Sequence, residues 1–157
     1  MTIHHQLSEM IDVVLPNVQN FHSRGQMAPH AASMNGAGQI KGSLLATDNG
    51  CHLTVPEALA HFESELRRAA EEGSIVASAI IFHGVGLADP AQPAQTKGEA
   101  SAIVALLEHE AGDSVFLVIP YQVTRRGIQY EMGKLVRKPA AVFLGAHSQA
   151  RPWWRSG

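Results

Sequence analysis

The sequence predicts an α+β domain in which two helices accompany a mainly antiparallel sheet of about five to six strands. Three observations support this class: two segments with helical apolar periodicity, a glycine-containing turn between short strands, and several apolar strands in the C-terminal half. The expected order is helix, hairpin, helix and then strands. A chain of 157 residues is the size of one domain, so we expect residues 1–157 to form a single globular unit.

The first helix is indicated near the N-terminus, where apolar residues recur at spacings of three and four. These residues are Leu7, Met10, Ile11, Val14, Leu15 and Val18. Pro16 interrupts the pattern, so the helix either ends near Leu15 or kinks and continues for one more turn. A hairpin is expected next, with strands around residues 28–34 and 39–46, because Asn35-Gly36 favours a tight turn.

The second helix is predicted from its first turn. Thr54 can cap it, Pro56 fits its first positions, and Glu57 lies three residues after Thr54, as a capping box requires. An apolar stripe follows, and Gly73 is expected to end the helix. The stripe comprises Leu59, Phe62, Leu66, Ala69 and Ala70.

Apolar strands dominate the rest of the chain. We expect a strand at 74–87, a hairpin over 101–123 that turns at Gly112-Asp113, and further strands at 128–136 and 140–144. Several of these strands are apolar at successive positions, which indicates a sheet covered on both faces. The cover is either the two helices or a partner subunit, and the second possibility favours a homodimer.

Two segments lack apolar periodicity. Residues 88–100 contain two prolines and are expected to form an exposed, mobile loop. Residues 146–157 form a C-terminal tail that contains Trp153 and Trp154. With the basic residues that precede it, this tail either attracts an anionic partner or packs on its own subunit or a dimer mate.

Composition excludes several classes of function. The net charge of −2 gives no general attraction to nucleic acid or to an anionic membrane. Cys51 is the only cysteine, so neither an intrachain disulfide nor a Cys-x-x-Cys site can form. The first residues lack the pattern of a signal peptide, and no apolar run is long enough to cross a bilayer. We therefore expect a soluble, cytoplasmic, bacterial protein.

Glu108, His109 and Tyr121 are the candidate catalytic residues. Glu108 and His109 are adjacent near a strand end, so they are expected to point to opposite faces of the sheet. A turn centred on Gly112-Asp113 would put Glu108 near Leu117 and His109 near Phe116. A carboxylate among apolar groups can act as a general acid or base. The alternative is that both side chains reach solvent at the strand end.

Tyr121, Arg125 and His83 are the candidate ligand-binding residues. Tyr121 follows a proline, which favours a sheet edge or a bulge, although tyrosine here also fits an ordinary core position. Nine histidines suggest a metal, but none pairs with another at metal-ligand spacing on one helix face. We therefore expect no metal and no other cofactor. His30, His83 and His109 are the histidines that fall on predicted strands and could converge.

Short motifs resemble those of a family of small uncharacterised bacterial proteins. They are Pro29-His-Ala-Ala32 before Gly38-Gln-Ile40, a capped helix, Leu107-Glu-His109 and Pro120-Tyr121. The element order is similar to that of the roadblock, longin and profilin-like α/β/α sandwiches, which often dimerise and act as binding platforms. The first resemblance implies no known activity, and likeness of layout does not transfer function.

The sequence as a whole favours a homodimeric binding module without an assignable catalytic activity. Its ligand would be a protein or a small molecule held near Tyr121 and the ends of the strands at 75–87 and 101–109. The alternative is a small enzyme that uses Glu108 or His109 as general acid or base in a pocket with Tyr121. In that alternative Arg125 orients the substrate and the loop at 88–100 acts as a lid.

Overall fold

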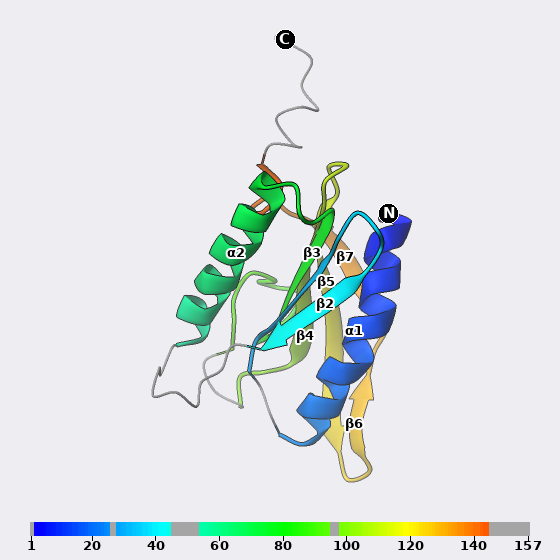
Figure 1. Cartoon of the computed structure of the whole chain (residues 1–157). Helices are drawn as coiled ribbons and strands as arrows, with labels where there is room; N and C mark the ends of the chain where they lie inside the picture. The colour runs from blue at the N-terminus through cyan, green and yellow to red at the C-terminus, as the bar shows by residue number, and fades with distance from the viewer. Residues whose placement is uncertain (1, 26–27, 45–53, 95–97, 145–157) are drawn as a thin grey trace.

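The computed structural model describes residues 2–25, 28–44, 54–94 and 98–144. In these parts a seven-stranded antiparallel sheet lies between two helices, which confirms the α+β class and adds one strand to the expected number (Figure 1). Helix α1 (His5–Ser23) covers one face and α2 (Val55–Glu71) covers the other. The strands are β1 (His30–Met34), β2 (Ile40–Leu44), β3 (Ala77–Gly84), β4 (Ala102–His109), β5 (Ser114–Thr124), β6 (Gly127–Tyr130) and β7 (Lys134–Arg137).

The sheet has the order β2-β1-β3-β4-β5, and the far side of β5 is shared by two strands. β7 pairs with the first half of β5 and β6 with its second half. The single strand predicted at 128–136 is therefore two strands. Pro120 lies where β5 changes partner, and its carbonyl oxygen accepts a hydrogen bond from the Glu131 N–H at 2.8 Å. A residue without an N–H is well placed at such a junction.

Helix α1 continues through Pro16 to Ser23, so the sequence alternative in which it ends near Leu15 is wrong. Pro16 lies on the exposed side, while Val18 beyond it is 1% exposed against the sheet. Burial of this apolar side stabilises the helix enough to tolerate the hydrogen bond that proline cannot donate. The helix thereby carries His22 to the far end of the sheet.

Helix α2 begins as the sequence predicts. The Thr54 side chain accepts a hydrogen bond from the Glu57 N–H, and the Glu57 carboxylate accepts one from the Thr54 N–H at 2.8 Å. Phe62 and Leu66 are buried against the sheet, which makes α2 the cover of the second face.

The two faces of the sheet are apolar because alternate residues of the central strands turn to opposite helices. Ile81 and Ile103 belong to the cluster beneath α1, whereas Ile80 and Phe82 contact residues on the α2 side. The cover that the sequence required is supplied by the chain's own helices. The apolar strands therefore give no argument for a partner subunit, and the homodimer stays a prediction.

The register of the β4–β5 hairpin differs from the expected one. Glu108 pairs with Ser114, not with the region of Leu117, which instead pairs with Ala105. The turn is centred closer to Ala111 than to Gly112-Asp113, because the His109 N–H already binds the Asp113 carbonyl oxygen at 2.9 Å. The prediction that Glu108 lies beside Leu117 is therefore wrong, since its neighbours across the sheet are Ser78 and Ser114.

Two further segments differ from the sequence prediction. Residues 140–144 form no strand, since the described backbone there bends and turns its N–H groups toward Glu108. Within 88–100, Pro93 bridges to Gly84 and Ala94 is buried, so part of this segment is attached to the sheet. Residues 95–97 and the whole of the predicted tail at 146–157, with Trp153 and Trp154, lie outside the described residues. Among the described residues, no helix combines the length and apolar character needed to cross a membrane.

Candidate functional site

One end of the α1 face carries imidazole and phenol side chains in place of the aliphatic residues found elsewhere on that face. His83 comes from β3, Tyr121 from β5 and Tyr130 from β6, where it pairs directly with Tyr121. His22, near the C-terminal end of α1, lies over them. We call these four residues the imidazole–phenol cluster.

His22 is the centre of the cluster. Its Nδ1 lies 2.8 Å from the Tyr130 hydroxyl oxygen, within hydrogen-bond distance. Its ring meets those of His83 and Tyr121 edge to face, with centroids 4.4 Å and 4.3 Å apart. Such edge-to-face contacts are favourable geometries for aromatic rings. The last turn of α1 is thus joined to three separate strands.

His83 is the least solvated member of the cluster. Its side chain is 4% exposed, and burial, followed by the nearby His22 and His30, lowers its pKa from 6.5 to about 4. The ring is therefore neutral at pH 7. Its Nδ1 has no hydrogen-bond partner among the described residues. Buried polar atoms are almost always paired, so such an atom indicates a position where a partner is missing.

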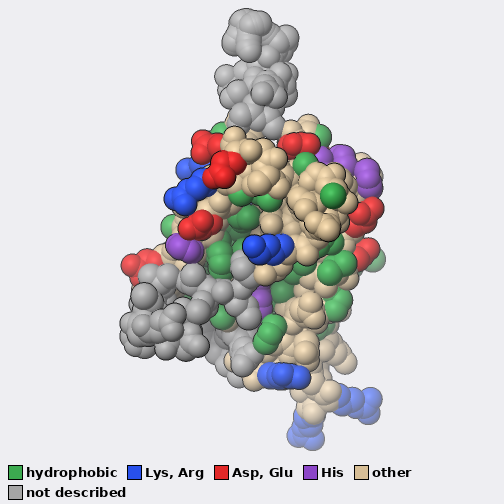
Figure 2. Space-filling view, in the orientation of Figure 1, with side chains coloured by type: hydrophobic (Ala, Val, Ile, Leu, Met, Phe, Trp, Pro, Cys, Tyr) green, Lys and Arg blue, Asp and Glu red, His purple; other side chains and the backbone are tan. Residues whose placement is uncertain are grey.

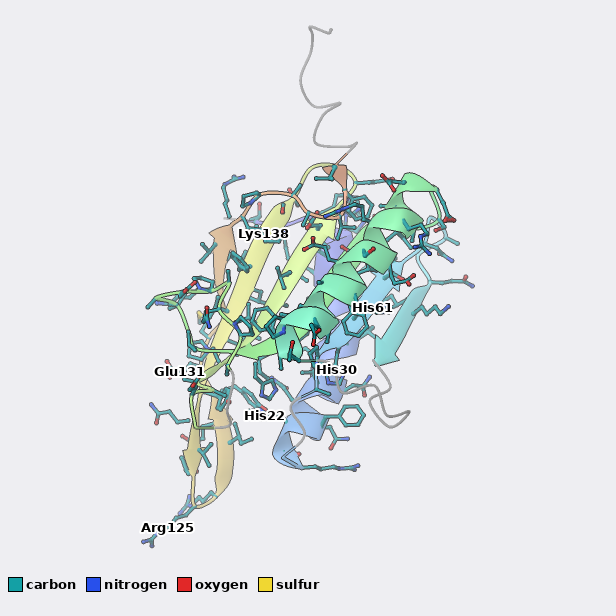
Figure 3. The ribbon with its side chains drawn as sticks, turned by 90° about the vertical axis from the view of Figure 1, so that its left-hand side faces the viewer. His22, His30, His61, Arg125, Glu131 and Lys138 are labelled. Carbon is teal, nitrogen blue, oxygen red and sulfur yellow. The ribbon has the colours of Figure 1, made fainter. Side chains whose placement is uncertain are left out.

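Burial disfavours the charged form of three neighbouring groups as well. Burial raises the pKa of Tyr121 and Tyr130 and lowers the pKa of His30, whose ring lies 5.3 Å from that of Phe21. His83, Tyr121 and Tyr130 therefore offer neutral hydrogen-bonding groups in an aromatic surround. Figure 3 shows His22 and His30 at the same end of the molecule.

Two of the predicted ligand-binding residues meet in this cluster and one does not. His83 and Tyr121 lie with ring centroids 6.3 Å apart. Arg125 instead occupies the exposed tip of the β5–β6 hairpin, away from His22 (Figure 3). In the space-filling view, Lys and Arg side chains stand at this lower tip of the molecule (Figure 2).

The sequence missed His22 and Tyr130. Tyr130 could have been found, since a hairpin that turns after Thr124 places it opposite Tyr121. His22 gave no comparable signal. Its contact with Tyr130 spans 108 positions of sequence and depends on α1 continuing past Pro16.

Glu108 is enclosed on the α2 face, but all of its oxygens are occupied. Its carboxylate accepts hydrogen bonds from three successive backbone N–H groups, at distances of 2.8 to 3.1 Å. These are the N–H groups of Ala141, Val142 and Phe143. Lys138 Nζ lies 2.7 Å away, and both side chains of this ion pair are 3% exposed. Glu108 therefore anchors the segment after β7 to the sheet and is not placed to exchange protons with a substrate.

His109 lies on the opposite face, beneath the N-terminal end of α1. Its ring stacks on that of His4 at 3.7 Å, its Nε2 lies 2.7 Å from Gln6 Oε1, and its Nδ1 accepts the Ala111 N–H at 3.0 Å. Since Nδ1 accepts, Nε2 carries the proton and donates to Gln6. Burial and the nearby His4 lower the pKa of His109, against the effect of Asp113. Nε2 thus holds the first turn of α1 through Gln6, and Nδ1 holds the turn between β4 and β5.

A groove of about 780 Å³ opens beside His109, lined also by His4, Gln6 and Glu71. It does not join the imidazole–phenol cluster. The Tyr121 N–H donates a hydrogen bond to the carbonyl oxygen of Ser101, which lies just before the first residue of β4. His109 is the last residue of the same strand. At 3.3 Å per residue, the two ends of β4 are about 25 Å apart. A pocket that combines Glu108 or His109 with Tyr121, as the enzyme alternative requires, is therefore not formed.

The three candidate metal ligands do not converge either. His30 and His83 lie at one end of the sheet and His109 at the other. Within the described part of the chain, no group of three or more His, Cys, Asp or Glu side chains is arranged to hold a metal ion. Cys51 and His52 lie outside that part.

Comparison of the chain with known proteins gave no match to a family model, to a curated protein or to a solved structure.

Proposed function

We propose that this chain is a binding module that holds a small, uncharged organic molecule against the imidazole–phenol cluster. The observation that carries the proposal is the buried Nδ1 of His83, which lacks a partner among the described residues. Leaving a buried polar atom unpaired costs ~1–3 kcal/mol. A ligand that supplies the missing hydrogen bond recovers that energy, and the cluster therefore favours an occupied state.

The chemistry of the cluster supports an uncharged ligand. His83 is neutral at pH 7 because its pKa is about 4, and the raised pKa values of Tyr121 and Tyr130 keep both phenols neutral. A charged ligand would lose its hydration here without meeting an opposite charge. An aromatic molecule with a polar edge matches the chemistry of these groups, since its ring can meet the phenols edge to face while its polar edge hydrogen bonds to His83.

The test is native mass spectrometry of untagged protein purified under non-denaturing conditions from its own source. We expect a mass excess of one small organic molecule, which is released when the protein is denatured and is absent from the His83→Phe variant. His61→Phe is the matched control, because His61 is an exposed histidine on α2. A bare wild-type mass would contradict the proposal, as would an excess that persists in His83→Phe.

Two further parts of the proposal concern the whole protein. The single cysteine favours a cytoplasmic module, since such a chain gains nothing from an oxidising compartment. We also propose that the module is a homodimer, and the support for this is that, among the described residues, β2 has a neighbouring strand on one side alone.

A further inference from the structure

The outer edge of β2 has a hydrogen-bonding pattern that repeats under a twofold rotation. In an antiparallel pair, residues alternate between those that bond the neighbouring strand and those whose N–H and C=O point away from it. The Asn35 N–H bonds the Gln39 carbonyl oxygen at 3.0 Å, which sets the phase of the hairpin. Lys41 and Ser43 therefore bond β1, whereas Ile40, Gly42 and Leu44 present their N–H and C=O groups to the outer edge, where no strand of the described part of the chain pairs with them.

The other side of β1 gives the same phase independently. The Glu110 N–H donates a hydrogen bond to the Val76 carbonyl oxygen, just before β3 begins. Because the bonding direction alternates along a strand, the even-numbered residues of β3 direct their N–H and C=O groups to β4, and the odd-numbered residues direct theirs to β1. Through the register of β1 with β3, even-numbered residues of β1 bond β3, and odd-numbered ones bond β2. Ser33 opposite Lys41 is thus a bonded pair, in agreement with the hairpin turn.

We infer that two copies of this chain pair through β2, antiparallel and centred on Gly42, to form one continuous sheet. This register places Gly42 opposite Gly42 of the second copy and Ile40 opposite its Leu44. It is the one antiparallel register in which all three outward-facing residues of each copy are paired. Lys41 then lies opposite Ser43 of the second copy, so the only charge on the strand does not face itself.

The surface beside β2 fits a second copy of the chain. A groove of about 510 Å³ runs between α1 and this edge, and its apolar lining includes Val13, Phe21, Ile40 and Gly42. Val13 is 54% exposed. In Figure 1 β2 lies in front of the other strands, and hydrophobic side chains reach the surface in the matching view of Figure 2. Twofold pairing brings the two α1 helices to the same side of the joined sheet, where these apolar side chains cover one another.

Gly42 allows a direct test, because a side chain can be added there without disturbing the monomer. A Cβ at Gly42 would meet only the Ala31 carbonyl oxygen at 3.9 Å, an ordinary contact, and its φ is not positive. Gly42→Lys or Gly42→Glu would place two like-charged side chains across the twofold axis, on Cα atoms about 5.5 Å apart. Analytical ultracentrifugation should show a wild-type dimer and, for each variant, a dissociation constant raised at least tenfold.

Mixing the two Gly42 variants tests whether the two copies meet at this residue. Equal amounts of Gly42→Lys and Gly42→Glu place opposite charges across the axis, and we expect a 1:1 heterodimer to form. Lys41→Glu is the control, since residue 41 faces Ser43 and its change of sign should leave the dimer intact. A heterodimer that fails to form, or a wild-type dimer that tolerates both Gly42 variants, overturns the β2 interface. A wild-type chain that stays monomeric overturns the inference altogether.

Hydrogen exchange gives a second measurement that needs no variant. The amides of Ile40 and Gly42 should become protected as wild-type concentration rises, whereas the Lys41 amide is protected at every concentration by its bond to β1. Equal behaviour of all three amides would overturn the inference. The inference deepens the homodimer part of the proposed function and is independent of His83. A monomer that still carries an organic adduct would refute the dimer alone.

Discussion

Acidification should destabilise this fold through His83 in particular. The unfolded chain gives this histidine a pKa near 6.5, and the folded protein lowers it to about 4. Between these values the unfolded state binds more protons than the folded state, so stability is lost as the pH falls. The contribution is complete above the unfolded pKa and disappears as the pH falls toward the folded pKa.

The size of the effect follows from the shift. The pKa of His83 falls from 6.5 in the unfolded chain to about 4 in the folded protein. At about 1.4 kcal/mol per pKa unit, the largest loss in the free energy of unfolding that this shift can cause is roughly 3 kcal/mol. Between pH 7.5 and pH 5.0 the same two values predict a loss of about 2 kcal/mol in the free energy of unfolding. The groups that face His83 are His22 from α1, His30 from β1 and Tyr121 from β5.

Urea denaturation at pH 7.5 and at pH 5.0 measures this difference. Wild type and His83→Phe share the other histidines, so subtracting their pH dependences isolates His83. The variant should lose about 2 kcal/mol less than wild type on acidification. His61→Phe, which removes an exposed imidazole, should behave as wild type. Equal losses for wild type and His83→Phe would mean that His83 titrates normally, and the reasoning from its burial would be refuted.

Two further predictions concern structural groups. Glu108→Gln should lower the free energy of unfolding by ~3–5 kcal/mol, since it leaves the buried Lys138 without a counter-charge. The double variant Glu108→Gln with Lys138→Met should recover part of that loss in urea denaturation, and equal losses for the single and double variants would contradict the ion-pair argument. Thr54→Ala should cost ~1 kcal/mol by removing the cap of α2, while Thr54→Ser should cost little. A thermal midpoint that is the same for all three proteins would show that this cap does not stabilise α2.

The parts of the fold that the sequence predicted depend on neighbouring residues. The capping box at Thr54 and Glu57 and the apolar stripe of α2 act within one or two turns of helix, and both are present. The β1–β2 hairpin is likewise local, although its positive φ is at Gly38 and not at Gly36. Local chemistry is sufficient in such cases because few alternative partners compete.

The parts that the sequence missed depend on partners far away in the chain. The apolar segment after β7 is predicted as a strand. Its N–H groups instead donate hydrogen bonds to the Glu108 carboxylate, more than 30 positions earlier in the chain, and so they are not available to pair with another strand. Helix α1 passes Pro16 because the sheet offers a surface for Val18. In both cases a tertiary contact outweighs the local preference.

The candidate site was half predicted for the same reason. Tyr121 and His83 are predicted as candidate ligand-binding residues, and each is a polar ring within an apolar strand. Their contacts with His22 depend on where α1 ends, far earlier in the chain, and therefore on the pairing of the strands and the length of that helix. Residue type identified the chemistry, and only the fold identified the partners.

The buried histidines of the described residues all lie on the α1 side of the sheet. His22 and His83 join the last turn of α1 to the strands, and His109 holds its first turn through Gln6. Protonation of His109 would cost the hydrogen bond that its Nδ1 accepts from Ala111, and protonation of His83 is opposed by burial. The opposite face is held by the Glu108–Lys138 ion pair and by the packing of aliphatic and phenylalanine side chains. Acid should therefore loosen α1 before α2. Since α1 lines both the imidazole–phenol cluster and the groove beside β2, mild acidification should weaken ligand binding and dimer formation while α2 remains in place.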